Sequence, residues 1–210
     1  ELVVAIWNIR TVAQRGSNGT RPAEDLLPAV SKYNCDFVAL QETRRGGRTA
    51  FHVPAAGYIV HCSGHCHGDV GKPGMLRVGL TIKETITSTL GPEAIAPEHV
   101  SARILKVRVA VRHRVATTSI VGYAPTETAQ GSENTKFWKT LCSSITRVPT
   151  NEHLVLMMDA NAHTGKREGG GMDDVRVLGE YGRDTRKDND RRLLKCAAEH
   201  KMAITNTFFR

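Results

Sequence analysis

The sequence lacks any long apolar run. None of its stretches approaches the roughly 20 consecutive apolar residues that a membrane-spanning helix needs. Residues 1–15 also lack the basic start and the apolar middle of a secretory signal. We therefore expect no membrane partner and an intracellular location.

The sequence also lacks an even set of cysteines, because it has five. Cys35, Cys142 and Cys196 sit among apolar residues in segments with strand or helix patterns, where a free thiol packs as a small hydrophobic group. This pattern argues against a disulfide framework and favours a reducing compartment. An initiating methionine is missing too. The chain begins at Glu1 and stops at Arg210 just after an apolar stretch, so we expect a piece of a longer protein.

Acidic residues are fewer than basic ones. The chain of 210 residues has 21 Asp and Glu against 29 Lys and Arg, a formal net charge of +8. Such a balance favours a polyanionic partner such as nucleic acid. The share of hydrophobic residues, 40%, is that of an ordinary globular protein, and the length suits one large core. We expect a single domain over 1–210 and a monomer.

Short runs of Val, Ile and Leu predict several β-strands separated by helices. The strands are predicted at 2–9, 36–41, 58–61, 77–83, 103–111, 115–124 and 153–158. Helical periodicity predicts helices at 23–33, 133–145 and 190–200, the first of them kinked or shortened by Pro28. This order of elements predicts a mixed sheet, or two sheets, with helices outside.

Polar side chains stand where five of the apolar segments end. Asp159 and Asn161 follow one strand and, being two residues apart, point to the same side of an extended chain. Ligand sites gather at such strand ends. The polar residues of the other four ends are Asn8 and Arg10, then Gln41, Glu42 and Arg44, then Tyr123 and Thr126, and finally Asn206 and Thr207.

This set of side chains suits the hydrolysis of a phosphate ester. One carboxylate with amides, carbonyls and waters is a ligand set for Mg²⁺, which neutralises phosphoryl charge and stabilises a leaving oxygen. A second carboxylate is then available to activate the attacking water. We predict Glu42 as the metal ligand and Asp159 as the water-orienting group. Taken singly, each residue has another interpretation: Glu42 as a solvated loop acid, Asp159 as a turn former and Tyr123 as a core aromatic. Because five apolar segments all end in polar residues of these kinds, we favour a common phosphate-ester site.

Five motifs resemble, in order, those of the endonuclease/exonuclease/phosphatase superfamily. They are "WNIR" (7–10), "LQETR" (40–44), "GYAPT" (122–126), "LMMDANAHTG" (156–165) and "DNDRRLLKCAAEHKMAITNTFF" (188–209). The likeness is strongest to the apurinic-endonuclease-like domain of non-LTR retrotransposons and to craniofacial development protein 2-like proteins. It implies an α/β (α+β) class and a DNase I-like four-layer sandwich, in which helices flank two packed mixed β-sheets.

The resemblance also implies roles for single residues. Glu42 would bind the catalytic Mg²⁺, for which Mn²⁺ is a possible substitute, with help from Asn8. Tyr123 would touch the scissile phosphate, while Asp159 and Asn161 would orient the nucleophilic water and the phosphate.

Further residues are expected at the DNA. Asn189 resembles the asparagine of the family's "N-x-N-G" turn, which faces the DNA backbone, although Asp190 stands here in place of the glycine. Asn206 and Thr207 resemble the family's "NT" strand beside the active site. We expect Arg10, Arg44, Arg45 and Arg48 to hold flanking phosphates. A solvated face is the expectation for Arg103, Lys106, Arg108, Arg112 and Arg114.

Two departures from the family pattern stand out. The family continues after "TNTFF" with a tryptophan-bearing strand, an "I-D-Y" strand and a final "S-D-H", so we expect weakened hydrolysis, missing C-terminal strands and an exposed sheet edge. The other is "VHCSGHCHGD" (60–69), a spacing that suits either Zn²⁺ binding or a polar loop between strands; we favour the loop. Its candidate ligands are His61, Cys62, His65, Cys66 and His67.

Three functions remain open. The first is an Mg²⁺-dependent, DNA-nicking endonuclease domain of a non-LTR retrotransposon or a derived gene, with DNA as partner, a reverse transcriptase domain in the same parent polypeptide, and a nuclear site of action. The second is a catalytically impaired domesticated module that binds nucleic acid or protein. The third is a hydrolase of lipid or inositol phosphates.

Overall fold

The chain divides into two compact units, which we describe separately. Unit 1 comprises Glu1–Tyr123 and Val148–Asp159, and unit 2 comprises Ala124–Arg147 and Ala160–Arg210. The structure, a computed structural model, describes residues 2–9, 23–44, 49–63, 76–110, 114–165, 167, 175–182 and 186–209. The expectation of a single domain over 1–210 stays a prediction.

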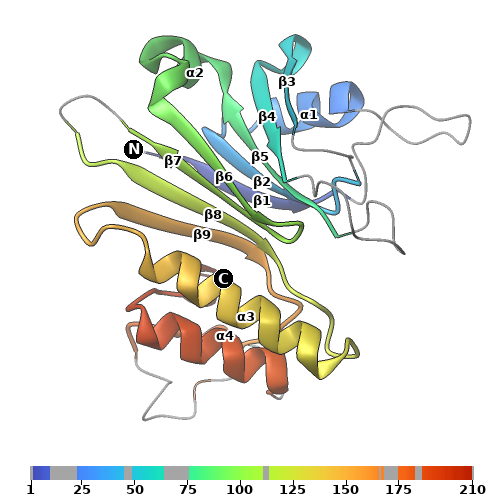
Figure 1. Cartoon of the computed structure of the whole chain (residues 1–210), viewed down its shortest axis with the longest axis vertical. Coiled ribbons are helices and arrows are strands. Elements are labelled where there is room, and N and C mark those ends of the chain that lie inside the picture. The colour runs from blue at the N-terminus through green and yellow to red at the C-terminus, as the bar shows by residue number, and fades with distance from the viewer. Residues whose placement is uncertain are drawn as a thin grey trace, which may run out of the picture. The chain divides into compact units, whose positions relative to one another are not determined.

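Unit 1 holds two mixed β-sheets (Figure 1). The five-stranded sheet has the order β1-β2-β5-β4-β3, and the four-stranded sheet the order β6-β7-β8-β9. β1 and β2 run parallel, as do β8 and β9, and the other neighbours are antiparallel. The strands are β1 (Val4–Asn8), β2 (Phe37–Gln41), β3 (Thr49–Val53), β4 (Tyr58–Cys62), β5 (Val78–Lys83), β6 (Ile95–Ser101), β7 (Ile104–Val109), β8 (Thr117–Tyr123) and β9 (His153–Asp159).

The two sheets pack face to face in unit 1. Their shared core contains Phe37 and Leu80 from one sheet and Leu105, Val121 and Met157 from the other. The alternation of strand side chains sends these residues to the inner faces. The expectation of two packed mixed sheets is confirmed.

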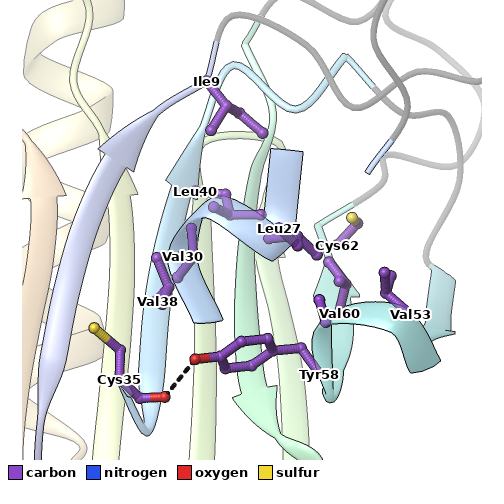
Figure 2. Packing of buried hydrophobic residues seen from close by; sticks show 11 residues of the cluster. Ile9, Leu27, Val30, Cys35, Val38, Leu40, Val53, Tyr58, Val60 and Cys62 are labelled. Carbon is purple, nitrogen blue, oxygen red and sulfur yellow. Dashed lines mark hydrogen bonds between the residues drawn. The ribbon is translucent and has the colours of Figure 1, made fainter. Parts of the chain in front are cut away.

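A second core lies on the other face of the five-stranded sheet. Helix α1 (Ala23–Ser31) packs Leu27 and Val30 against Val38 and Leu40 of β2 (Figure 2). Because β2 is covered on both faces, all five of its residues are buried, which explains its continuous apolar run. Pro28 lies inside α1, which ends at Ser31, short of the predicted residue 33.

Three elements of unit 1 were not predicted. β6 contains Pro97 and Glu98, which do not read as a strand but are tolerated because β6 is the edge of its sheet. β3 is short, and it is the edge of the other sheet. Helix α2 (Glu84–Leu90) has the sequence "ETITSTL". Its β-branched residues have low helix propensity, so the sequence does not predict a helix there. None of the described helices is long and apolar enough to cross a membrane.

Unit 2 holds helices α3 (Gly131–Thr146) and α4 (Asp188–Glu199), which lie side by side (Figure 1). The predicted strand at Asn206 and Thr207 is wrong, because Thr205–Thr207 forms a 3₁₀ turn. The Thr207 hydroxyl closes this turn by donating to the carbonyl of Ile204 at 2.6 Å. Strand pairing is limited there to one parallel bridge between Leu178 and Ile204.

We predict that unfolding stability depends on the core between the two sheets. Leu80 is fully buried there, so Leu80→Ala should lower the free energy of unfolding by about 2–5 kcal/mol through lost burial and a cavity. Ile6→Ala is the matched control, because Ile6 is 51% exposed, and it should change stability by less than about 0.5 kcal/mol. Urea unfolding measures both, and equal losses would contradict this role for the core.

We also predict an alkaline stability change that depends on Tyr58. Its buried hydroxyl donates to the carbonyl of Cys35 at 2.7 Å (Figure 2), so Tyr58→Phe should cost about 1–2 kcal/mol. Burial, followed by the nearby Cys35 and Asp36, raises the pKa of Tyr58 above its ordinary 10.0. The contribution of Tyr58 is therefore complete below that value and falls as the pH rises toward the folded-state pKa.

Urea unfolding between neutral pH and pH values above the ordinary tyrosine pKa tests this prediction. Tyr33→Phe is the control, because Tyr33 is 76% exposed. The alkaline loss of stability should shrink in Tyr58→Phe and persist in Tyr33→Phe; the same loss in both variants would show that other groups cause it.

Candidate functional site

Two parallel strand pairs position the candidate site in unit 1. The register pairs Asn8 of β1 with Gln41 of β2, and Tyr123 of β8 with Asp159 of β9, at the last residue of each strand. Glu42 follows β2 directly. Since the carboxyl ends of parallel strands meet at one edge of a sheet, each pair delivers polar side chains to a single edge.

The polar side chains of the two edges contact each other. The Asn8 amide nitrogen donates to Glu42 Oε1 at 3.0 Å and to Asp159 Oδ2 at 3.2 Å. The Tyr123 hydroxyl donates to the same Glu42 Oε1 at 3.0 Å. We call these four residues, Asn8, Glu42, Tyr123 and Asp159, the strand-end cluster. The sequence predicted all four, and the structure brings them together.

The backbone turns sharply at Glu42. Its φ is +57°, and that of Arg44 is +52°, a left-handed conformation that is uncommon for residues other than glycine. On either side of Glu42, Gln41 and Thr43 are fully buried, and their side-chain polar atoms find no partner among the described residues. Buried polar groups are normally paired. The turn that presents Glu42 therefore lies between two buried polar side chains that the described part of the chain leaves unpaired.

Charge in the strand-end cluster is predominantly negative. Glu42, 20% exposed, and Asp159 contribute two carboxylates that share one amide donor. Arg44 Nη2 lies 3.7 Å from Glu42 Oε2, with its side chain 39% exposed, so this ion pair contributes little stability. Two carboxylates and one amide fit a hard divalent cation such as Mg²⁺, which takes oxygen ligands, commonly one or two carboxylates, and keeps several waters.

Arg103 supports Tyr123 and was missed by the sequence analysis, which placed it on a solvated face. Its guanidinium lies over the Tyr123 ring, 5.5 Å from the centroid, and Nη1 donates to the Tyr123 carbonyl at 3.2 Å. A cation over an aromatic face is a stabilising contact. The contact follows from the antiparallel register of β7 with β8. This register pairs Ile104 with Gly122 and so brings Arg103 beside Tyr123.

Two further basic residues of this group form ion pairs. Lys106 pairs with Glu98, and Arg108 Nε lies 2.7 Å from Glu152 Oε1. The hydrogen bond from Arg108, with one from Thr118, holds the pKa of Glu152 below its usual value despite partial desolvation. Arg108 is exposed, as expected of a solvated face, whereas the Lys106 side chain is only 15% exposed and departs from that expectation.

Unit 2 carries the remaining described site candidates. Asn161, with φ +44°, donates from Nδ2 to the Ala124 carbonyl at 2.8 Å. Asn189 is fully buried, and its Nδ2 donates to the carbonyls of Pro125 at 2.9 Å and Asn161 at 3.3 Å. Its Oδ1 accepts from Trp138 Nε1 at 3.3 Å. Asn189 thus organises unit 2 internally, and the expected contact with DNA stays a prediction.

Asp190, which replaces the expected glycine, has a structural role. Its buried carboxylate accepts from the backbone nitrogen of His163 at 2.6 Å and from that of Lys187. The second contact belongs to a capping box that begins α4. The loop after Asp159 is therefore tied to the start of a helix by a residue that no motif assigned.

The other candidates differ in their exposure. Asn206 is exposed, whereas Thr207 is buried and accepts from the nitrogen of Gly179 at 2.8 Å. His61 and Cys62 lie in β4. Arg10, Arg45, Arg48 and Arg112 lie outside the described residues, as do His65, Cys66 and His67.

No protein-family model and no curated protein matches this sequence. Solved structures do match. An AP endonuclease from Leishmania major is 13% identical, with 95% of this chain and 66% of that one covered at a TM-score of 0.55.

Two other structures match less well. They are an endonuclease/exonuclease/phosphatase from Beutenbergia cavernae (17% identity, 79% and 48% coverage, TM-score 0.48) and a humanized D. rerio TDP2 (15%, 76% and 66%, 0.47).

The chain spans between 44% and 67% of the length of these and three further solved structures. At such low identity the likeness concerns the fold alone. Two packed mixed sheets, together with the match to the Leishmania enzyme over most of the chain, show that this protein has the DNase I-like fold of the endonuclease/exonuclease/phosphatase proteins.

Proposed function

We propose that this chain is a divalent-metal-dependent phosphodiester hydrolase that nicks DNA. The observation that carries the proposal is the strand-end cluster, in which Glu42 and Asp159 accept hydrogen bonds from one Asn8 amide and Tyr123 donates to Glu42. One acid can hold a cation, the other can act as a base, and the phenol hydroxyl can donate a hydrogen bond, all at one place. Those are the groups that phosphate ester hydrolysis requires.

Glu42 is the proposed holder of the cation. It sits on a constrained left-handed turn, and Tyr123 and Asn8 both donate to the same carboxylate oxygen, so the side chain has one preferred orientation. Its second oxygen, Oε2, lies 3.7 Å from the Arg44 guanidinium. When Mg²⁺ is bound there, it supplies neutralisation of phosphoryl charge and stabilisation of the leaving oxygen.

Asp159 is the proposed group that orients the attacking water. It ends a strand whose neighbour ends in Tyr123, so both side chains leave the same edge of the sheet. A carboxylate accepts a proton from water, and a phenol hydroxyl donates to a phosphate oxygen. Arg103 fixes the ring of Tyr123 and adds positive charge behind it, where it favours an anionic substrate.

DNA is the substrate that the charge of the chain favours. A formal net charge of +8 suits a polyanion, and an AP endonuclease from Leishmania major has a similar fold. The origin in a non-LTR retrotransposon, a linked reverse transcriptase domain, nuclear action, a monomeric state and the use of Mn²⁺ stay predictions from the sequence.

The proposal predicts that Glu42→Gln abolishes nicking. Loss of the negative charge weakens cation binding, and we expect the rate to fall about 100-fold or more. The measurement is conversion of supercoiled plasmid to open circles by the 210-residue chain with Mg²⁺, beside an EDTA control. Glu98→Gln is the matched control, because Glu98 lies on β6, at the opposite edge of its sheet from β9.

Nicking that both variants retain would show that the activity lies elsewhere. A folded chain that binds plasmid but never nicks it with Mg²⁺ or Mn²⁺ would contradict the hydrolase and favour the nucleic-acid-binding module.

Tyr123→Phe tests the hydrogen bond to Glu42 separately from the charge. Removing the hydroxyl leaves the ring and its contact with Arg103 in place, so the fold should persist. A lost hydrogen bond to a charged group costs about 1.5–3 kcal/mol, which corresponds to a rate roughly 10–100-fold lower. We expect the variant to need more Mg²⁺ for half-maximal nicking. Unchanged rate and Mg²⁺ dependence would remove Tyr123 from the site.

A further inference from the structure

Two thiols and an imidazole come together in unit 2, in a cluster that the proposed function does not use. Cys142 lies on α3, Cys196 on α4, and His200 directly after α4. Their candidate ligand atoms all lie within 4.8 Å of one another. The two sulfur atoms are 3.1 Å apart and belong to free thiols.

The helix pair explains why these side chains meet. Cys196 lies in the last turn of α4, and His200, four residues later, is the residue that follows the helix, so both lie at its carboxyl end. α3 and α4 lie side by side (Figure 1), and Trp138 of α3 contacts Asn189 near the start of α4. Four residues further along α3, Cys142 reaches the end of α4. One helix therefore supplies two candidate ligands and its neighbour supplies the third.

The chemistry of this set differs from that of the strand-end cluster. Thiolate and imidazole are the ligands of Zn²⁺, whereas Mg²⁺ takes oxygen. In a tetrahedral site with Zn–S bonds of 2.3 Å, two sulfur atoms stand about 3.7 Å apart. The sulfurs of Cys142 and Cys196 need to separate by only a fraction of an ångström to reach that spacing.

The surroundings favour a cation. The hydrogen bond with Cys196 lowers the pKa of Cys142 to about 6; burial opposes this shift, and His200 adds to it. The same hydrogen bond, with burial, raises the pKa of Cys196. The Glu199 carboxylate adds negative charge nearby, although Lys195 lies 3.8 Å from it.

We propose that Cys142, Cys196 and His200 form a zinc site that fastens the end of α4 to α3. Cys196 is buried, while Cys142 and His200 are half-buried, so three protein ligands leave a fourth position for water. Asn189 holds the start of α4 through Trp138, and the zinc site would hold its end. Binding of both sulfurs as thiolates would release the thiol protons.

Cobalt titration of the reduced, chelator-stripped 210-residue chain tests the proposal directly. Co²⁺ reports thiolate ligands through charge-transfer absorption and four-coordination through its visible bands. We expect one Co²⁺ per chain with both signals, displacement by Zn²⁺, and a higher melting temperature in the presence of zinc. A folded chain without the thiolate absorption would overturn the proposal.

Variants identify the ligands. Cys142→Ser and His200→Asn should each weaken Co²⁺ binding about 100-fold or more, because loss of a ligand costs at least as much as loss of its outer-shell partner. Because Cys142 and His200 are only half-buried, both variants should fold, which circular dichroism checks.

Two controls separate this site from other thiols. Cys66→Ser removes a thiol of the 61–67 segment, and Cys35→Ser removes a buried thiol of unit 1. Both should bind Co²⁺ as the unchanged chain does. Loss of binding in Cys66→Ser with full binding in Cys142→Ser would overturn the proposal and move the metal to the 61–67 segment.

Discussion

The burial of β2 on both faces is the constraint on which unit 1 depends. One face packs under α1, and the other faces the four-stranded sheet across the shared core. A strand held in this way cannot slide by one residue without exchanging the side chains that fit the two cores, Val38 and Leu40 in one and Phe37 and Ala39 in the other. The position of its last residue is therefore fixed, and so is the position of the backbone at Glu42, the next residue.

One parallel strand pair in each sheet accounts for the position of the strand-end cluster. Each sheet is mostly antiparallel but contains one parallel pair, β1 with β2 and β8 with β9. Contacts join these two pairs across the sandwich, so all four carboxyl ends come to one place. Antiparallel neighbours alone would have sent alternate strand ends to opposite edges. The mixed sheets thus serve to gather polar groups that are far apart along the chain.

Much of this architecture could be predicted from residue patterns. The strands at 36–41 and 153–158 are largely apolar runs followed by polar residues, and such runs identify both the strand and the end that carries the polar side chains. β6 and α2 were not predictable, because Pro97 and the β-branched residues of "ETITSTL" contradict their local structure and only pairing or packing overrides them. Arg103 and Asp190 were missed since their roles come from tertiary contacts.

The single amide shared by Glu42 and Asp159 has a consequence for the energetics of the site. Two carboxylates that accept from one amide nitrogen carry like charges that repel each other, and the Asn8 hydrogen bonds offset part of that repulsion. The rest is compensated when the chain folds, by the packing of both sheets. The fold thus holds the two acids in place beforehand, and under the proposed function a bound cation would relieve the repulsion between them.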